Sequence, residues 1–541
     1  MFLSVRNYLR GPYTLYHKGK GNDKYEEAPV PLEHKWLPGD AIDPETGRVT
    51  TRNAAPIVGI VDYLSRTGQG FTGRGIPLYM FYPLSESYPP MIVSSKQNPK
   101  ENKIVVVNYE HWESKWPRAG IQRVLGSVGD ISVEKTALLM RSSTHSKVSV
   151  SDIQYTASSA SSASSASHTS CAWDKVFNID PDGCLDVDDV LCWRRIENGY
   201  EFGIAIADVA AWIAEGSDLD IAAYLAAQTL YIDGFSAKPM LPTSLSESAS
   251  SLRSDGLTRP ALALIYTIPD EKTDEIHSRW ERILISTHKT YTYDTVYEDV
   301  DLCAKLTGFL TSICCYQDVT TDSHRWIELA MLTYNRAAAR VLRDAGAGIL
   351  RSHSGTPQAE WSLLAEQTGC ADLAWFGYAS GKYVRTPATN EDAGPVGSVF
   401  HAGLGLDCYC HASSPLRRYA DLTNQRWLKH ILFDEEAPRL SVSPAYLSER
   451  GRVAKQLDRD IWFLSNLRPD RITTTEGILI SEGQEGRWKV YVPEWRRKIT
   501  GKFNTSPDAI IGRRVVVRAY TNLKSAQYEN RLVCSLELIP T

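Results

Sequence analysis

Five aspartates crowd into one short stretch of the chain, and their spacing suits chemistry that depends on metal ions. The stretch reads NIDPDGCLDVDD over residues 178–189. Its aspartates are Asp180, Asp182, Asp186, Asp188 and Asp189. Carboxylates this close repel one another unless a cation lies among them. Hard divalent cations take oxygen ligands, and two such ions need several carboxylates. The cluster therefore predicts a two-Mg²⁺ site that acts on a phosphodiester.

Two other interpretations of the stretch stay open. Numbered from Asn178, oxygen-bearing side chains fall at EF-hand loop positions 1, 3, 5, 9 and 12, with Gly183 at position 6. The context opposes a calcium site, because a Ser-rich segment precedes the stretch and position 12 is Asp instead of Glu. The second alternative is a solvated acidic turn. Apolar neighbours oppose it, because they indicate a partly buried loop in which unpaired carboxylates are costly. These neighbours are Ile179, Leu185, Val187 and Val190.

A second candidate residue is Arg417, in the sequence SSPLRRYADLTNQ. Ser414 suits a helix N-cap and Pro415 the first helical position, which places Arg417 in the first helical turn. A helix N-terminus presents free N–H groups to an anion, and an arginine adds a bidentate clamp, so Arg417 is a candidate phosphate ligand. The alternative is an ordinary ion pair with Asp421, which Arg418 also suits.

The elements that must position these residues fall into three regions. In the first, PIVGIVDYL, KIVVVNYEHW and RVLGSV read as short strands and predict a small barrel. Residues 157–167, ASSASSASSAS, cannot bury a core and predict a linker. After this linker helices and strands mix: Ser217 caps one predicted helix, and a longer helix begins at Ser323 and stops at Gly346. From about Thr473 alternating strands return over about 70 residues, which suits an OB-type barrel.

Charge is unevenly spread along the chain. The net charge of −5 gives no general support for nucleic-acid binding. From residue 473 to 541, however, eleven Lys and Arg stand against seven Asp and Glu, a surplus of four. Trp488 and Tyr491 lie among these basic residues. The tail barrel is therefore predicted to contact phosphates and to stack on bases.

Composition excludes several classes of protein. No run of 18 apolar residues exists, so no membrane span is predicted. The ten cysteines include no Cys-x-x-Cys pair, and Cys408-x-Cys410-His411 is too cramped for a tetrahedral zinc site. We therefore expect reduced thiols in an intracellular, cytoplasmic protein, with His401 and His411 in structural roles. The first 22 residues contain basic but no acidic side chains. An organellar presequence is one interpretation, but RGPY interrupts any amphipathic helix, which favours a basic arm or a partial first domain.

Two separated motifs make the chain resemble a known nuclease family. NIDPDGCLDVDDVLCWRRIENGYEFGIAIADVAAWI, residues 178–213, and HAGLGLDCYCHASSPLRRYADLTNQ, residues 401–425, are similar to the two halves of the signature of the ribonuclease II and ribonuclease R family, the RNB nucleases. DPDGCLDVDD and the segment from PLSESYPP to WPRAG look most like the eukaryotic branch, that of the exosome's catalytic subunit and its exosome-independent relatives. The resemblance covers about residues 53–541, and the endonuclease domain of the exosome subunit is not expected.

The resemblance implies a multidomain α+β protein, in which a mixed α/β RNB catalytic domain is flanked by small β-barrel OB-fold domains. The implied domains are a partial or degenerate first cold-shock domain over residues 1–52, a second cold-shock domain over 53–150, a linker over 151–172, the RNB domain over 173–470 and an S-one-type OB domain over 471–541. The implied activity is 3′→5′ hydrolysis of single-stranded RNA to 5′-nucleotides with Mg²⁺, for which Mn²⁺ could substitute. A monomer is expected, with association with a larger RNA-decay complex as the alternative. The competing function is a regulator that binds RNA without hydrolysing it.

The resemblance assigns roles to the charged residues of the two motifs. Asp180, Asp186, Asp188 and Asp189 match the metal-site aspartates, and Asp188 is also expected to be catalytic. Asp182 falls outside that set and is expected to be a solvated turn residue. Arg417 matches the arginine that grips the scissile phosphate, and Arg418 is expected to contact RNA or to pair with Asp421.

Other roles fall on residues between the two motifs. Tyr293 matches the tyrosine near the reacting 3′ end, and Tyr231 matches an aromatic near the terminal nucleotides, although either could pack in a core. Glu328 is expected to contact RNA, but the family's Glu-Glu pair is Glu328-Leu329 here, so one acidic contact is lost. Only 34 residues separate Tyr293 from Glu328, fewer than is usual in the family, and the missing piece would include an element of the channel wall.

Overall fold

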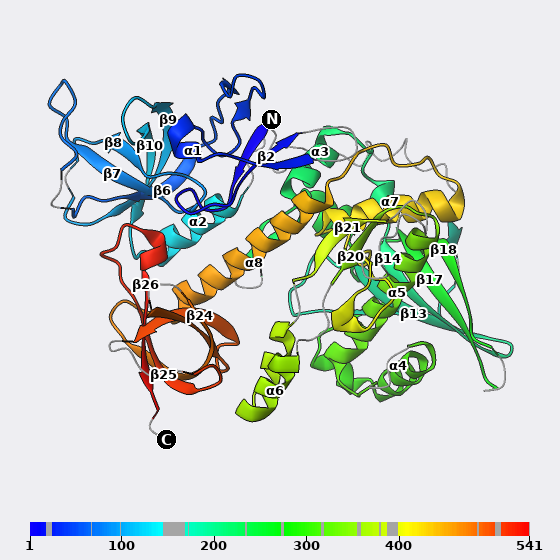
Figure 1. The fold of residues 1–541 in the computed structure, drawn as a ribbon. Helices are drawn as coiled ribbons and strands as arrows, with labels where there is room; N and C mark the ends of the chain where they lie inside the picture. Colours follow the sequence, from blue (N-terminus) through cyan, green and yellow to red (C-terminus); the bar gives the residue numbers. More distant parts are fainter. Residues whose placement is uncertain are drawn as a thin grey trace. The chain divides into compact units, whose positions relative to one another are not determined.

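The computed structural model of the protein divides into two compact units (Figure 1). Unit 1 comprises Met1–His145, Ala359–Gly377 and Val453–Thr541, and unit 2 comprises Ser146–Gln358 and Tyr378–Arg452. The structure describes residues 1–17, 24–65, 68–97, 99–143, 168–170, 172–232, 235–271, 275–314, 319–353, 359–377, 380–386, 399–483, 486–503 and 510–539. The predicted linker over residues 157–167 lies outside these described residues.

Unit 1 begins with a small sheet and a closed barrel, and the barrel was predicted. The barrel order is β10-β8-β7-β6-β9. Its strands are β6 (Ile57–Val61), β7 (Leu78–Pro83), β8 (Met91–Ser94), β9 (Lys103–His111) and β10 (Arg118–Ser127), and α2 (Ile131–Ser142) follows. The preceding sheet has the order β3-β2-β1-β4-β5. It contains β1 (Phe2–Val5), β2 (Tyr13–His17), β3 (Lys24–Glu27), α1 (Pro31–His34), β4 (Ala41–Ile42) and β5 (Val49–Thr51). Leu3 and Trp36 share one core with Phe81 and Val105, so sheet and barrel pack together.

The C-terminal part of unit 1 is a second closed barrel, with the order β22-β23-β24-β26-β25. Its strands are β22 (Thr473–Glu482), β23 (Arg487–Val492), β24 (Arg497–Phe503), β25 (Arg514–Thr521) and β26 (Leu532–Leu538). The prediction that Trp488 and Tyr491 stack on bases is wrong. Trp488 packs inside the barrel, and Tyr491 is buried on its outer side. The surplus of basic residues could not predict which aromatic side chains would be buried in the packing of the barrel.

Residues 359–377 pack on this barrel, although they come from the middle of the chain. The segment contains α6 (Ala359–Thr368) and the 3-10 helix η6 (Ala371–Gly377). Leu364 and Leu373 form one apolar cluster with Ile478 and Tyr491. No sequence pattern predicted this contact, because only tertiary structure brings the two segments together.

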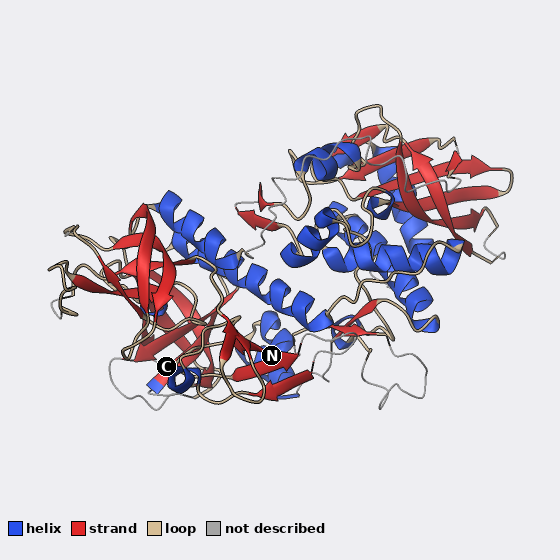
Figure 2. Cartoon of the chain, turned by 90° about the horizontal axis from the view of Figure 1, so that it is seen from above, coloured by secondary structure: helices blue, strands red, loops and turns tan. Residues whose placement is uncertain are grey.

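Unit 2 is built on a seven-stranded sheet with the order β11-β18-β17-β14-β13-β12-β19. The strands are β11 (Thr169–Ser170), β12 (Lys175–Ile179), β13 (Asp189–Ile196), β14 (Gly199–Ala207), β17 (Arg259–Pro269), β18 (His277–Ile285) and β19 (Lys289–Tyr291). The helices are α3 (Asp218–Ala226), α4 (Val300–Ile313), α5 (Ser323–Asp344), α7 (Tyr419–Phe433) and the start of α8 (Pro444–Asn466). Two further antiparallel pairs are formed by β15 (Leu230–Ile232) with β16 (Phe235–Lys238) and by β20 (Ile349–Ser352) with β21 (Lys382–Arg385). Figure 2 distinguishes these helices from the strands.

Both faces of the seven-stranded sheet are buried, which explains the continuous apolar run VLCW in β13. Val190 and Cys192 point into one core, and Leu191 and Trp193 point into the other. The first core includes residues of α3 and the start of α7, and the second includes residues of α4 and α5. The sheet is therefore a rigid base for the loop that precedes β13.

Two predicted helix starts and one predicted helix end have different outcomes. Ser217 caps α3 as predicted, because its hydroxyl accepts from the Asp220 N–H. The cap of α5 is Asp322 instead of Ser323, whose hydroxyl donates to the Tyr293 carbonyl at 2.7 Å. The predicted stop at Gly346 is confirmed, since α5 ends two residues earlier and Gly346 has a φ of +63°.

The predicted helix start at Ser414 is wrong. Helix α7 begins at Tyr419, and residues 415–417 form a turn before it. The physical reason is a short antiparallel pairing with a distant segment. The Thr229 N–H donates to the Arg417 carbonyl at 2.9 Å, and the Tyr419 N–H donates to the Ala227 carbonyl at 2.8 Å. Arg417 therefore precedes the helix instead of lying in its first turn.

Two further expectations concern cysteines and membranes. The eight cysteines within the described residues are all free thiols. Across the described part of the chain, no helix combines the length and the apolar character that a membrane crossing requires.

Candidate active site

The acidic loop connects β12 to β13 in unit 2. Asp180 directly follows β12, and Asp189 is the first residue of β13. Because strands flank the loop on both sides, the EF-hand interpretation is excluded. Ser251 fixes the loop from outside, since its hydroxyl donates to the Leu185 carbonyl at 2.7 Å and accepts from the Val187 N–H at 3.0 Å.

The residues of the acidic loop differ in their solvent exposure. Asp188 is only 3% exposed, whereas Asp182 is exposed, as expected for a residue outside the site. Val187 and Val190 are buried, but Leu185 is 47% exposed, so that part of the burial prediction is wrong. The solvated-turn interpretation therefore fails for Asp188.

Asp188 and Arg417 form the centre of the site. One Asp188 carboxylate oxygen accepts from the Leu416 N–H at 2.8 Å, and the other accepts from the Arg417 Nε at 3.0 Å. Arg417 also donates from Nη2 to the Ser414 hydroxyl at 3.1 Å. Its side chain is 47% exposed, so part of the guanidinium faces solvent.

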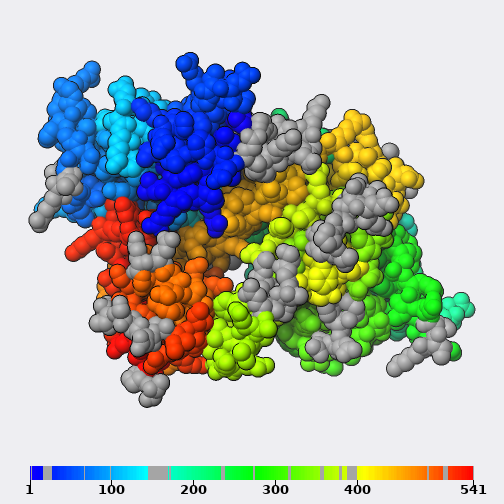
Figure 3. Space-filling view, viewed as in Figure 1, coloured from blue at the N-terminus to red at the C-terminus, as the bar shows by residue number. Residues whose placement is uncertain are grey.

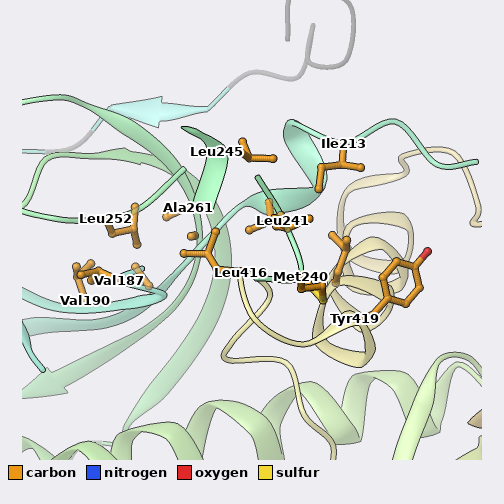
Figure 4. Packing of buried hydrophobic residues seen from close by; sticks show 14 of the residues in the cluster. Val187, Val190, Ile213, Met240, Leu241, Leu245, Leu252, Ala261, Leu416 and Tyr419 are labelled. Carbon is orange, nitrogen blue, oxygen red and sulfur yellow. The ribbon is translucent and has the colours of Figure 1, made fainter. Parts of the chain in front are cut away.

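The apolar neighbours of these two residues explain how the pair forms. Figure 4 shows Val187 and Val190, which flank the aspartates, in the same core as Leu416 and Tyr419, which flank Arg417. Burial of these side chains fixes both backbones. The acidic loop and the turn before α7 therefore meet although Asp188 and Arg417 are 229 positions apart in the sequence.

Burial disfavours the charged forms of three carboxyl groups of the loop. Burial raises the pKa of Asp188 to about 7, against the opposing charge of Arg417. Burial also raises the pKa of Asp180, and the charge of Asp186 adds to that rise. The pKa of Asp189 lies well above its ordinary value, because of burial first and then the charges of Asp180 and Asp188. These four predicted residues therefore share one electrostatic environment.

Two tyrosines border the carboxylates. The Tyr231 hydroxyl donates to Asp186 at 2.8 Å. The Tyr293 ring stacks on the His324 ring, with centroids 3.8 Å apart and an interplanar angle of 14°. Burial raises the pKa of Tyr293 to about 12, and the charges of Asp180 and Asp189 contribute, which places this tyrosine near them. Neither tyrosine is fully buried, although Tyr293 also packs against one of the cores of unit 2.

Two predicted RNA-contacting residues have protein partners in the structure. Arg418 donates from Nη2 to Asp421 at 2.8 Å, which is the ion pair given as its alternative. Glu328 is exposed, and its carboxylate accepts from Arg325 at 2.8 Å. Their contact with RNA stays a prediction.

Sequence reasoning missed three polar groups near the cluster. Asn178 donates to Asp180 at 2.7 Å and is itself held by the Thr290 hydroxyl at 2.8 Å. Ser414 orients Arg417, a role different from the cap predicted for it. The Cys184 thiol lies 3.7 Å from Asp186, and burial raises its pKa. Single polar side chains of this kind form no pattern that a sequence could reveal.

The aspartate carboxylates of the site are of the kind that binds divalent cations, but they do not surround a common point. Within the described residues, no three His, Cys, Asp or Glu side chains are close enough together to hold a metal ion. Asp188 and Asp186 are engaged by Arg417 and Tyr231. The pKa values of Asp180, Asp188 and Asp189 are nevertheless raised, by burial first, and a bound cation would oppose that effect. We conclude that the carboxylates fit Mg²⁺ in type and charge, and that they must turn toward an ion to bind it.

Two family models match the chain. The RNB domain model matches residues 172–307 and 302–434, and the Dis3-like cold-shock domain 2 (CSD2) model matches residues 78–143. The chain therefore contains an RNB domain. The predicted fold class is confirmed: a mixed α/β RNB domain accompanied by small closed barrels of the OB type.

Curated relatives of this RNB protein include Exoribonuclease 2 from two bacteria. The protein from Escherichia coli strain 536 is 28% identical over 373 residues, with 55% of this chain and 56% of that protein covered. The protein from Escherichia fergusonii is 29% identical over 365 residues, with the same coverage. The chain spans about half the length of the curated relatives it matches.

Solved structures share the RNB fold at low sequence identity. The apo form of Mycoplasma genitalium RNase R has a TM-score of 0.70 at 16% identity, with 99% of this chain and 100% of that chain covered. The same RNase R has also been solved with ribose-methylated single-stranded RNA, again with a TM-score of 0.70 at 16% identity and the same coverage. Yeast Ssd1, described as a pseudonuclease, has a TM-score of 0.62 at 14% identity, with 96% and 81% covered. At these identities the likeness shows the fold alone.

Proposed function

We propose that the protein is a 3′→5′ exoribonuclease that hydrolyses single-stranded RNA to 5′-nucleotides, acting as a monomer. The observation that carries the proposal is the contact of the buried Asp188 with the half-exposed Arg417, on a loop that also contains Asp180, Asp186 and Asp189. Such a group suits divalent cations and a phosphate at the same place. The RNB domain supports the same reaction class.

The cation would be held by the carboxylates. Asp180, Asp186, Asp188 and Asp189 would be its ligands, with Mg²⁺ expected and Mn²⁺ as a substitute. When bound, such ions lower the pKa of a water molecule and neutralise charge on a phosphate. The protein contributes a rigid loop between β12 and β13, so the ligands come from one well-ordered strand end.

Arg417 would bind the scissile phosphate. Asp188 and Ser414 fix its guanidinium through Nε and Nη2, while nearly half of the side chain stays exposed. An arginine oriented in this way can donate two parallel hydrogen bonds to phosphate oxygens. It would also stabilise the charge that develops during phosphodiester cleavage.

Tyr231 and Tyr293 would hold the last nucleotides of the strand. Stacking on aromatic rings binds single-stranded RNA without selecting a base. Tyr293 is supported by His324, and Tyr231 is oriented by its bond to Asp186. Both rings therefore approach the carboxylates in restrained orientations.

A regulator that binds RNA without hydrolysing it is the second candidate. Two observations favour it: no three potential ligands are gathered closely within the described residues, and the fold is shared with a pseudonuclease. Intact carboxylates and Arg417 favour the enzyme, because a binding surface has no need of buried, repelling acids.

The deciding experiment uses one RNA strand labelled at either end. With Mg²⁺ or Mn²⁺, a 3′ label should appear at once in a mononucleotide, whereas a 5′ label should pass through progressively shorter fragments. EDTA should stop both. Binding of intact RNA with no shortening in either metal would contradict the enzyme and favour the regulator.

A further inference from the structure

One buried serine binds two backbone groups of the acidic loop. Ser251 is 0% exposed, and its hydroxyl donates to the Leu185 carbonyl at 2.7 Å and accepts from the Val187 N–H at 3.0 Å. These two groups belong to the two rigid peptide planes on either side of Asp186. A single oxygen atom therefore restrains both backbone dihedral angles of Asp186, and with them the direction in which its side chain leaves the main chain.

The peptide planes that follow in the loop are restrained by backbone groups. The Val187 carbonyl accepts from the Leu252 N–H at 2.9 Å, and the Asp188 carbonyl accepts from the Ala207 N–H at 2.8 Å. The second half of the acidic loop is thus held at successive peptide planes. Two of these planes depend on a side chain, that of Ser251, so this part of the arrangement can be altered by substitution.

Ser251 can serve as a fixed point because its own segment is anchored to the seven-stranded sheet. The segment begins with η4 (Leu245–Ala249), a turn of π-helix, which is a rare conformation that is frequent at functional sites. Arg259, the first residue of β17, is 3% exposed and donates from Nη2 to the Ser248 carbonyl at 2.9 Å. Its guanidinium is oriented in turn by Asp255, through hydrogen bonds of 2.6 and 2.7 Å.

Apolar packing encloses the bond between this segment and the loop. Figure 4 shows Leu245 and Leu252, which precede and follow Ser251, in the same core as Val187 and Val190. Without the hydroxyl, the Val187 N–H would lose its partner in surroundings from which water is largely excluded. The loop would have to shift in order to recover one.

A site for a divalent cation benefits from such a fixed main chain. The carboxylates of Asp186 and Asp188 are engaged by Tyr231 and Arg417 and must turn to bind an ion. With the main chain restrained, only side-chain dihedral angles change, so little conformational entropy is lost when an ion binds. Removing the hydrogen-bond partners that hold metal ligands in place typically weakens metal binding by about 10- to 100-fold.

We propose that Ser251 is a positioning residue of the cation site, which holds the main chain around Asp186 and Asp188 so that both carboxylates can turn toward one ion. Ser251 acts through the loop and contacts neither the ion nor RNA. The proposal rests on the proposed cation site, but not on hydrolysis. It predicts a specific defect, which is weaker metal binding with unaltered RNA binding.

The test measures Mn²⁺ binding to the full chain without RNA, by electron paramagnetic resonance. Ser251→Ala should weaken Mn²⁺ binding by about 10- to 100-fold. RNA binding in EDTA should stay within about twofold of that of the unaltered protein, because no charge is removed. In the hydrolysis assay the same variant should need correspondingly more Mg²⁺, and saturating Mg²⁺ should restore most of the release.

The neighbouring serine provides a matched control. Ser250 is 1% exposed and donates to the Leu245 carbonyl at 2.8 Å, so Ser250→Ala also loses a buried hydrogen bond, but one that does not reach the loop. Both alanine variants should lower the melting temperature, whereas Ser250→Ala should bind Mn²⁺ within about twofold of the unaltered protein.

Two further substitutions at the same position separate the hydroxyl from the packing. Ser251→Thr keeps the hydroxyl and should bind Mn²⁺ within about threefold of the unaltered protein. Ser251→Cys keeps only a weak donor and acceptor, so it should show the defect in a milder form. Thermal melting identifies any variant that fails to fold, and if Ser251→Ala does, Ser251→Cys takes its place in the comparison.

Three outcomes would contradict the positioning role. The first is equal Mn²⁺ affinity of the unaltered protein and both alanine variants. The second is an equal loss in both alanine variants, which would assign the effect to general destabilisation of the segment. The third is the absence of Mn²⁺ binding by the unaltered protein.

Hydrolysis assayed on the same preparations separates the two proposals. Hydrolysis by every variant with equal Mn²⁺ affinities would contradict the role of Ser251 alone. The predicted differences in Mn²⁺ affinity without any hydrolysis would contradict only the exoribonuclease.

Discussion

At the scale of single residues, the site depends on buried charges that meet through their neighbours. The sequence identified Asp180, Asp186, Asp188, Asp189 and Arg417 as one group, and the structure brings them together in one environment. Their catalytic roles stay predictions. Asn178 and the orienting role of Ser414 could not be foreseen, because each depends on a hydrogen bond to one specific partner.

The hydrogen bond from Tyr231 to Asp186 gives the first prediction. Tyr231→Phe keeps the ring for stacking but removes the hydroxyl that holds the carboxylate. A hydrogen bond to a charged group is worth about 1.5–3 kcal/mol, so turnover should fall roughly tenfold to a hundredfold. RNA affinity should change little, because the aromatic face remains. Steady-state kinetics and binding on one preparation check this, and an unaltered turnover would show that Asp186 needs no such support.

At the scale of elements, the sequence-based predictions were wrong where contacts with a distant segment determine the local structure. Helix α7 starts at Tyr419 because residues 417–419 pair with residues 227–229, and no local cap signal at Ser414 could compete. The barrels and the long helix α5 were predictable, since their apolar periodicity is local. The position of residues 359–377 on the C-terminal barrel was not, because the segment carries no signal of its destination.

A buried ion pair joins α2 to the C-terminal barrel within unit 1. Arg531 donates two hydrogen bonds to Glu134 at 2.7 and 2.9 Å, and the side chains are 4% and 1% exposed. Arg531→Ala strands a buried carboxylate and should lower the free energy of unfolding by about 3–5 kcal/mol. Arg518→Ala, which breaks an exposed pair with Glu537, should cost at most about 1 kcal/mol. Urea denaturation compares the two, and equal costs would mean that Glu134 finds another partner.

A second ion pair gives a prediction about the stability of the protein at low pH. Asp299 accepts from Lys175 at 2.8 Å and from Tyr291 at 2.7 Å, and these contacts lower the pKa of Asp299 to about 2. A lowered folded-state pKa contributes stability that is present above the unfolded value near 4 and lost as pH falls through about 2.

Asp299→Asn should therefore lower the free energy of unfolding by about 1–2 kcal/mol at pH 7, a figure reduced for partial solvent screening. The difference from the unaltered protein should shrink below about pH 3. Denaturant unfolding between pH 7 and 2 measures it. Asp301→Asn is the control, because Asp301 is 75% exposed and its ion-pair partner among the described residues is Lys305. A difference that persists at pH 2 would rule out the ion pair as its cause.

At the scale of the whole molecule, the candidate carboxylate site and the basic barrel belong to different units. The carboxylate site lies in unit 2, while the basic tail barrel and the RNB family's second cold-shock region lie in unit 1. Composition predicted this division through the charge surplus of residues 473–541. It could not predict that Tyr491 is buried, because that burial depends on the contact with residues 359–377. In Figure 3 the yellow-green surface of these residues adjoins the orange and red surface of the barrel.

The Ser-Ala tract over residues 157–167 should be dispensable for chemistry. It contains no large apolar side chain and so has nothing to bury. A Gly-Ser sequence of equal length in its place should leave mononucleotide release within about twofold, because such linkers differ little in reach. A collapse of release, with RNA binding also reduced, would show that the tract contacts the RNA.

The central claim is that the acidic loop hydrolyses RNA with divalent cations, and Asp188 tests it most directly. Asp188→Asn keeps the shape of a buried side chain but removes a charge beside Arg417. Asp182→Asn makes the same change on the exposed part of the same loop and serves as the control. Arg417→Ala should impair both turnover and the grip on the last phosphate.

The measurement is Mg²⁺-dependent mononucleotide release together with RNA binding, for the unaltered protein and these variants. Asp188→Asn should lower release by roughly three powers of ten or more while RNA affinity holds or rises, since a repelling carboxylate is gone. Asp182→Asn should behave as the unaltered protein. Near-normal release by a folded Asp188→Asn would show that the carboxylates are not the catalytic metal site, and would favour the RNA-binding regulator.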